Sequence, residues 1–191
     1  EGGTLTTELL KHLGCSPDTA SASALVQQRK KLAPETFPAL FDLFVRKTQP
    51  LKLYKGFRLL AADGSDVRIP SNPEHTASHY PGTNGQAPYN ILHLDAIYDL
   101  LQCTYQDAYL VGDRDSNEQA SLCHMVDRSP AENALIIVDR GYEGYNLLAH
   151  IQEKGWFFLI RIKDNTNGIT SGLDLPDTME YDMPFHLNLT R

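Results

Sequence analysis

The sequence predicts a mixed α/β fold, and the main reason lies between residues 134 and 163. Leu135–Val138 is a β-branched run that is too short for a helix and favours a buried strand. An amphipathic helical segment follows and ends at Gly155, and a second apolar run, Trp156–Ile162, favours another strand. A strand, a helix and a strand in about thirty residues form a crossover unit of a parallel sheet.

The preceding residues predict an antiparallel part of the same sheet. Ile91–Tyr98 and Cys103–Val111 are strand candidates joined by a short turn, and Phe57–Ala62 is an earlier apolar run. A helix that begins at Asp115 or Ser116 and runs through Val126 leads to the parallel strands. This order of elements is that of an RNase H-like mixed sheet with flanking helices, in which the first and fourth strands are neighbours.

The first fifty residues predict a small helical region with a basic character. Helices are expected over Thr4–Leu13, from Ser16 or Ser21 to Leu32, and from Pro34 to Val45. The formal net charge is −7, yet residues 1–62 carry nine basic and five acidic side chains. A basic arm on an acidic body suits contact with nucleic-acid phosphates. The alternative is a solvated helical face without a partner.

We therefore expect three parts. They are a helical, basic N-terminal region at 1–50 with DNA contact as its expected role, an RNase H-like core at 56–164, and the truncated start of a β-rich insertion at 165–191. The last part is turn-rich, with short alternating pieces suited to hairpins. The chain begins with Glu1 and its last stretch has no closing element, so we expect a fragment.

Two acids follow apolar strands and are the candidate metal ligands. Asp139 follows Leu135–Val138, and Asp63 follows Phe57–Ala62, with Asp66 as a rival to Asp63. The alternative for Asp139 is a helix cap or turn, and the alternative for Asp63 is an Asp-Gly hairpin turn. If the first and fourth strands are neighbours, these two carboxylates meet at one edge of the sheet and suit a divalent metal.

Other features exclude several classes of site. Cys15, Cys103 and Cys123 are scattered, which argues against a disulfide framework or a zinc site and predicts reduced, half-buried thiols. His75 and His79 are four residues apart, but they lie in a Pro- and Gly-rich loop and make a poor metal pair. No run approaches the length of a membrane span, so a cytoplasmic location is expected.

Three segments carry a resemblance to a known family. They are LLAADGSDVRIP, LHLDAIYDLLQCTYQDA and, most specifically, IIVDRGYEGYNLLAHIQEKGWFFLIRIKD. These segments resemble the DDE transposases of bacterial insertion sequences, in the insertion-sequence-four family. The likeness covers most of residues 20–165. It implies an RNase H-like core interrupted by a β-rich insertion, and an enzyme that cuts and joins DNA.

The resemblance implies roles for individual residues. By position, the first catalytic Asp matches Asp63 and the second matches Asp139. The family's third acid is a Glu in a Tyr-x-x-Arg-x-x-x-Glu pattern, which does not occur here, so it is expected beyond Arg191. A fragment without that acid is expected to be inactive alone; should it prove active, Glu143 and Glu153 are the first places to look for a third ligand.

The resemblance also implies cofactors and partners. Two Mg²⁺ or Mn²⁺ ions, held by the two Asp carboxylates, would stabilise the attacking and leaving oxygens of the phosphodiester. DNA, as element ends and target, is the expected partner, with a homodimer or higher assembly on DNA near the bacterial nucleoid. The alternatives are an inactive DNA-binding remnant and a metal-dependent nuclease. The candidate DNA-contacting residues are Arg29, Lys30, Lys31, Arg140, Tyr142, Arg161 and Lys163.

Overall fold

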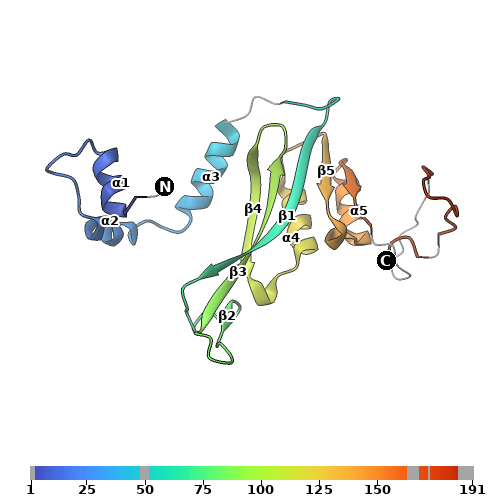
Figure 1. Cartoon of the computed structure of the whole chain (residues 1–191). Coiled ribbons are helices and arrows are strands. Elements are labelled where there is room, and N and C mark those ends of the chain that lie inside the picture. The colour runs from blue at the N-terminus through green and yellow to red at the C-terminus, as the bar shows by residue number, and fades with distance from the viewer. Residues whose placement is uncertain (1–2, 48–51, 163–167, 172, 185–191) are drawn as a thin grey trace. The chain divides into compact units, whose positions relative to one another are not determined.

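The computed structural model describes residues 3–47, 52–162, 168–171 and 173–184 (Figure 1). The chain divides into two compact units, Glu1–Gln49 and Pro50–Arg191, and each is described by itself below. No helix among the described residues has both the length and the apolar character needed to cross a bilayer.

The N-terminal unit contains three helices, as predicted. They are α1 (Leu5–His12), α2 (Ala22–Arg29) and α3 (Thr36–Lys47). The hydroxyls of Thr4 and Ser21 cap the first two, each accepting a hydrogen bond from the backbone N–H three residues on. The second helix ends at Arg29, so it is shorter than predicted and Lys30 is its C-cap. No residue of these three helices is buried.

The second unit is built on a six-stranded mixed sheet (Figure 1). The strands are β1 (Arg58–Ile69), β2 (His79–Tyr80), β3 (Tyr89–Asp99), β4 (Thr104–Gly112), β5 (Ala134–Val138) and β6 (Phe157–Ile160). β3 pairs antiparallel with β1, β2 and β4, whereas β5 lies parallel between β1 and β6. The predicted order of antiparallel strands followed by parallel ones is confirmed. The strand predicted at Phe57–Ala62, which begins at Arg58 in the structure, pairs as expected with the strand that contains Leu135–Val138.

The first strand is twice as long as predicted. It does not end at Ala62, and Asp63–Gly64 is not a turn but the middle of β1, paired with Ala96 and Asp95. The physical reason is the long partner β3, which pairs with β1 from Leu60 to Ile69 and so keeps the Asp-Gly dipeptide extended. An Asp-Gly hairpin would need a returning strand directly after it, and here that strand begins at Tyr89.

Two helices, α4 (Glu118–Arg128) and α5 (Tyr145–Glu153), flank this sheet and bury their apolar stripes in one core. The buried residues of each helix lie within two turns on the side that faces the sheet, while buried residues alternate along β5 and the first half of β1. The main core residues are Leu60, Ala62, Ile97, Leu122, Met125, Val126, Ala134, Ile136, Val138, Tyr142, Leu147, Ile151 and Trp156.

Three details differ from the sequence analysis. The loop at 71–89 contains the short strand β2, and Cys15 and Cys103 are exposed, whereas Cys123 is buried. Burial raises the pKa of the Cys123 thiol. In the stretch 165–191 the described residues, 168–171 and 173–184, form turns and bends without a strand, so the predicted hairpins are absent from them.

A buried ion pair ties β1 to the end of β3. Arg58 Nε and Nη2 donate to Asp99 Oδ2 at 3.1 and 2.9 Å, and the Asp99 side chain is 0% exposed. The other oxygen of Asp99 accepts from the backbone nitrogens of Leu101 and Gln102, so the carboxylate also shapes the β3–β4 turn. With both oxygens satisfied, the pair is well bonded, and removing one partner would leave a buried charge.

We predict that Arg58→Met lowers the free energy of unfolding by about 3–5 kcal/mol, because Asp99 loses its counter-ion inside the protein. Urea unfolding followed by circular dichroism measures the change. Arg128→Met is the matched control, since Arg128 pairs with Asp107 at the surface and its side chain is 49% exposed. That change should cost about 1 kcal/mol or less. Equal effects of the two substitutions would contradict the prediction.

Candidate functional site

The pairing of β1 with β5 sets the positions of the two predicted ligands. The parallel register joins Arg58 to Ala134 and continues to Ala61 and Ile137. Extended by two residues, the same register aligns Asp63 with Asp139, whose backbone is still extended. Side chains alternate along a strand, so Asp63 lies on the face opposite the buried Ala62, and Asp139 is the first residue after the buried end of β5, Val138. Both Asp63 and Asp139 are exposed.

Asp139 is held by the turn that follows it. Its Oδ1 accepts a hydrogen bond from Gly141 N at 2.6 Å and caps the short 3₁₀ helix η2 (Arg140–Tyr142). The capping role weighed as the alternative in the sequence analysis is therefore present. The cap uses one carboxylate oxygen, and a carboxylate has a second oxygen that can bind a cation, so the cap and metal binding are compatible roles for one Asp.

The start of α4 is bound to this same turn. Gln119 Nε2 donates to the carbonyl oxygens of Gly141 at 3.1 Å and Glu143 at 3.2 Å. This contact brings the preceding residue, Glu118, to the site. A Cβ built on Gly141 would lie 3.6 Å from Glu118 Oε2, and one built on Gly64 would lie 2.9 Å from Glu118 Oε1. Glu118 therefore lies beside Gly64 and Gly141, which follow the two predicted ligands Asp63 and Asp139 in the chain.

Behind Gly64, β3 contributes a histidine and an acid to the face covered by α4. His93 Nε2 lies 3.3 Å from Asp95 Oδ1 and 3.6 Å from Glu118 Oε1, while His93 Nδ1 lies 2.8 Å from Asp66 Oδ1. Asp95 is 1% exposed, and neither of its carboxylate oxygens has a hydrogen-bond donor among the described residues. A buried carboxylate without donors is unfavourable unless a cation is near.

The electrostatics reflect this crowding of acids. Partial burial raises the pKa of Glu118, His93 opposes the shift, and the charges of Asp95, Asp63 and Asp139 add to it. Burial disfavours the charged form of His93, but its hydrogen bond to Asp66 and the charges of Asp95, Asp66 and Glu118 raise its pKa on balance. Glu118 thus links the acids near His93 to Asp63 and Asp139 electrostatically. We call these five residues the acid cluster: Asp63, Asp66, Asp95, Glu118 and Asp139.

The remaining candidate residues are spread over the chain. Arg29, Lys30 and Lys31 are exposed at and after the end of α2, and Arg140 and Arg161 are exposed in the second unit. The backbone nitrogen of Arg161 donates to the Val138 carbonyl, so Arg161 lies at the strand end that carries Asp139. Lys163 lies outside the described residues.

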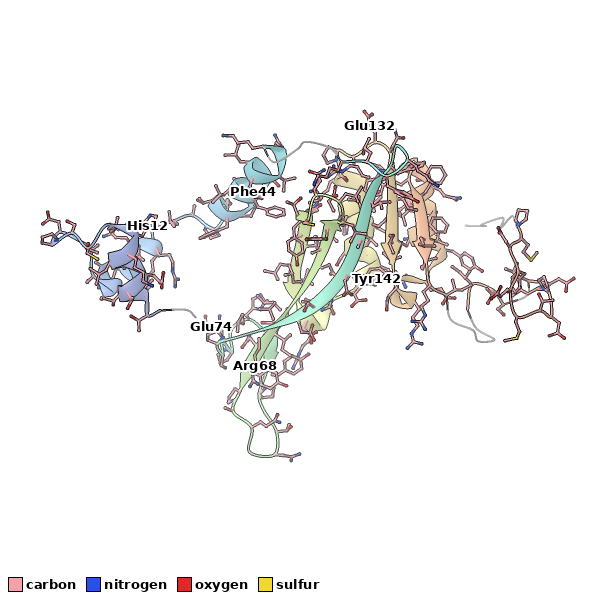
Figure 2. The ribbon with its side chains drawn as sticks, turned by 45° about the horizontal axis from the view of Figure 1, so that its top comes forward. His12, Phe44, Arg68, Glu74, Glu132 and Tyr142 are labelled. Carbon is pink, nitrogen blue, oxygen red and sulfur yellow. The ribbon has the colours of Figure 1, made fainter. Side chains whose placement is uncertain are left out.

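Tyr142 occupies a different place from the one predicted. The sequence suggested a DNA-contacting residue beside Asp139, but Tyr142 is 1% exposed and packs in the core (Figure 2). Burial, with the nearby acids, raises the pKa of its hydroxyl far above the usual range. A side chain that is buried in the core is not exposed for contact with DNA, and we leave it out of the proposed contacts below.

The structure also shows the contacts of the His75–His79 pair and of the two glutamates considered as a third ligand. His75 Nδ1 and Ser78 Oγ are 2.6 Å apart, while His79 Nδ1 lies 3.1 Å from Asn90 Oδ1, so the two histidines serve different loop contacts. Glu143 accepts a hydrogen bond from the backbone of Ile169, and Glu153 lies at the end of α5. Glu118, rather than Glu143 or Glu153, is the glutamate that lies beside both Gly64 and Gly141.

Comparison with known proteins identifies the family. The model of the transposase DDE domain matches residues 54–183, which is more than half of the chain and includes the whole acid cluster. The chain belongs to the transposase DDE domain family. Membership supports an enzyme of the polynucleotidyl transferase type and divalent-metal chemistry.

A solved structure is also similar to this DDE domain chain. It is the cryo-EM structure of a piggyBac transposase synaptic complex with hairpin DNA, at 12% sequence identity and a TM-score of 0.45. The likeness covers 78% of this chain and 32% of that one, so this chain spans about a third of the piggyBac protein. None of the proteins with curated descriptions matches this chain.

Sequence reasoning missed Glu118, Asp95 and His93 as members of the DDE domain's acid cluster and its surroundings. An acid in the first turn of a helix, such as Glu118, has an ordinary explanation in the helix dipole. Asp95 and His93 alternate with Leu92, Leu94 and Ala96 along a strand, and that pattern could have signalled two polar residues on a buried face.

We predict that Glu118→Gln stabilises the metal-free protein at neutral pH. A carboxyl whose pKa is raised by folding binds more protons when folded than when unfolded, so its contribution to stability falls as pH rises above the unfolded pKa. Removing the charge should remove that loss. The gain should therefore appear at pH 7 with a chelator present and vanish below about pH 4.

Thermal unfolding at several pH values measures this effect. Glu132→Gln is the control, because Glu132 is exposed just before β5, at the end of the strand opposite the site (Figure 2). It should leave the pH dependence unchanged. A Glu118→Gln variant that is less stable than the parent protein at pH 7 would contradict the electrostatic account.

Proposed function

We propose that this chain is the catalytic part of a DNA transposase of a bacterial insertion sequence, of the insertion-sequence-four branch, with an RNase H-like core. The proposed reaction is metal-dependent cleavage at the ends of the element, followed by strand transfer. One observation supports it: the β1–β5 register, extended by two residues beyond the Ala61–Ile137 pair, puts Asp63 level with Asp139 within a transposase DDE domain.

The register also favours Asp63 over Asp66 as the first acid. Asp66 lies three residues further along β1, so it occupies the other face of the strand, where its Oδ1 bonds His93 Nδ1. The Oδ1 of Asp63 instead accepts from the backbone nitrogen of its own neighbour, Gly64. We therefore propose Asp63 and Asp139 as the metal-binding pair, and Asp66 as the residue that orients His93.

The donor set fits the proposed metal. Carboxylate oxygens are the hard ligands that Mg²⁺ and Mn²⁺ prefer, and the mutual repulsion of Glu118 with Asp63 and Asp139 is what a cation would relieve. When bound, the two ions would supply electrostatic stabilisation of the attacking and leaving oxygens of a phosphodiester. We propose that Asp63 and Asp139 hold them.

The protein's own contribution is to keep these carboxylates in place. Asp63 lies in a strand that is paired on both sides, and Asp139 is fixed by the Gly141 N–H. Gln119 then ties the Gly141 turn to α4, so three elements are joined around the acids. A rigid arrangement limits the reorganisation needed when charge develops in the transition state.

We propose that DNA binds through phosphates to basic residues in both units. Arg140 and Arg161 lie at the strand ends beside Asp139, and Arg29, Lys30 and Lys31 are exposed in the first unit. Lys163 remains among the proposed contacts on sequence grounds. Assembly as a homodimer or higher on paired element ends is part of the same proposal, with the nucleoid as the place of action.

The first test is Asp139→Asn in the protein encoded by the full reading frame that contains these 191 residues. Asparagine keeps the shape and the oxygen that accepts from Gly141, but it removes the charge that binds metal. Cleavage of labelled element-end DNA with Mg²⁺ or Mn²⁺ should fall below detection, while DNA affinity in a gel-shift assay should be retained.

Asp107→Asn is the control, because Asp107 pairs with Arg128 at the surface of β4. It should cleave like the parent protein. Cleavage that survives Asp139→Asn would overturn the proposed role of this acid, and cleavage without strand transfer would instead indicate a nuclease. DNA binding without any cleavage by the parent protein would identify a non-catalytic DNA-binding protein.

The second test concerns the N-terminal unit. Lys30→Ala together with Lys31→Ala should weaken DNA binding and lower the slope of log K against log salt by about one for each phosphate that is no longer bound. Lys11→Ala is the control, because Lys11 lies in α1 and pairs with Glu8 of its own helix. If the double variant keeps both the affinity and the slope, these lysines make no phosphate contact.

A further inference from the structure

We propose that His93, Asp95 and Glu118 form a second metal site, distinct from the Asp63–Asp139 pair, that binds a divalent transition-metal ion. The three residues come from β3 and from the first turn of α4, and their ligand atoms lie within 4.8 Å of one another. None of these three residues is one of the proposed Mg²⁺ ligands, Asp63 and Asp139. The second site and the proposed transposase function can therefore be tested independently.

The separations of the ligand atoms match those around a bound ion. Two ligand atoms about 2.1 Å from a metal, at an angle of about 90–110°, lie about 3.0–3.4 Å apart. His93 Nε2 is 3.3 Å from Asp95 Oδ1 and 3.6 Å from Glu118 Oε1. Little movement of side chains would be needed for these three atoms to coordinate one ion.

The polar atoms that face this space are buried and have no hydrogen bond within the described part of the chain. His93 Nε2 and both oxygens of Asp95 are the atoms concerned, and Asp95 is 1% and His93 8% exposed. Folding rarely leaves buried polar groups without partners, and an ion is one of the few partners that can satisfy all three atoms together.

Gly64 leaves the space that the ion would occupy. A Cβ at this position would lie 2.6 Å from His93 Nε2, 2.9 Å from Glu118 Oε1 and 3.0 Å from Asp95 Oδ1, so it would lie close to the middle of the ligand set. The backbone of Gly64 is ordinary extended strand, and hence the open space, rather than a left-handed conformation, is what the glycine provides.

Asp66 orients the histidine from the opposite side of its ring. Its Oδ1 lies 2.8 Å from His93 Nδ1, which favours the tautomer with the proton on Nδ1 and a free lone pair on Nε2. Asp113 lies near the same side of the ring but accepts a hydrogen bond from the Tyr80 hydroxyl. The Nδ1 side is thus satisfied by protein groups, which places the ion on the Nε2 side.

The ligand set selects the class of metal. Mg²⁺ prefers oxygen ligands only, whereas an imidazole with two carboxylates suits Zn²⁺, Co²⁺, Fe²⁺ or Mn²⁺. Glu118, whose side chain is 41% exposed, gives the ion a route from solvent. The competing account is that His93 is a protonated counter-ion to Asp95 and Glu118, and the experiment below separates the two.

The test is binding of Co²⁺ to the purified protein, followed by visible absorption, in excess Mg²⁺ so that oxygen-only sites are filled. The parent protein should bind one tight Co²⁺ equivalent. Asp66→Asn, which changes a side chain that is 58% exposed and should not disturb folding, should weaken binding about 10–100-fold because the ring is no longer oriented. His93→Gln and Gly64→Ala should weaken it further.

Two controls separate this site from its surroundings. His150→Gln removes another His–Asp pair, the one with Asp127 at 3.0 Å, and should leave Co²⁺ binding unchanged. Asp139→Asn should abolish DNA cleavage but keep the tight Co²⁺ equivalent, so the proposed function and this inference can fail independently. Circular dichroism confirms that each variant is folded.

Two results would overturn the proposal. One is the absence of tight Co²⁺ binding in the parent protein, with the His93 ring titrating in NMR spectra as an imidazolium that added Co²⁺ does not perturb. The other is tight binding that survives in folded His93→Gln and Asp66→Asn variants, which would place the metal elsewhere. Loss of binding in these variants alone, with both controls intact, would support it.

Discussion

The pairing of β1 on both of its edges is the constraint on which the rest of this domain depends. On one side β3 pairs with it antiparallel through ten residue pairs, and on the other β5 pairs with it in parallel. These two registers are fixed by the buried residues Leu60, Ala62 and Ile136, because a slip of one residue would move them to the other face. The same registers place Asp63 level with Asp139 and Gly64 level with Asp95.

These strand registers bring the acid cluster together, and the clustering of like charges has an electrostatic cost. Like charges brought together destabilise the folded state at neutral pH, and the raised pKa of Glu118 reports both its burial and that repulsion. Natural domains keep such clusters where a function needs them, because a cation or a reacting group offsets the repulsion. By contrast, the buried Arg58–Asp99 pair, at the Asp99 end of the β1–β3 ladder, brings opposite charges together and so compensates its own charge.

Much of the fold could be read from local patterns, but the site could be read only in part. Leu135–Val138 and the segment up to Gly155 predicted β5 and α5 because burial and period act within a few residues. The extension of β1 through Asp63–Gly64 depended on pairing with β3, about thirty residues away, which no local pattern records. Glu118 and His93 were missed for the same reason, since the tertiary fold alone brings α4 and β3 to Gly64.

At Gly64, charged groups on the two faces of the sheet can influence each other electrostatically. Asp63 lies on one face and Asp95 on the other, and the charges of both act on Glu118, whose carboxylate lies where a side chain at position 64 would be. Charges separated by only a few ångströms in a partly buried setting interact strongly. A change of charge among His93, Asp95 and Glu118 must therefore alter the potential at Asp63 and Asp139. In the proposed metal site, the affinity of Asp63 and Asp139 for a cation would thus depend partly on the charges of His93, Asp95 and Glu118.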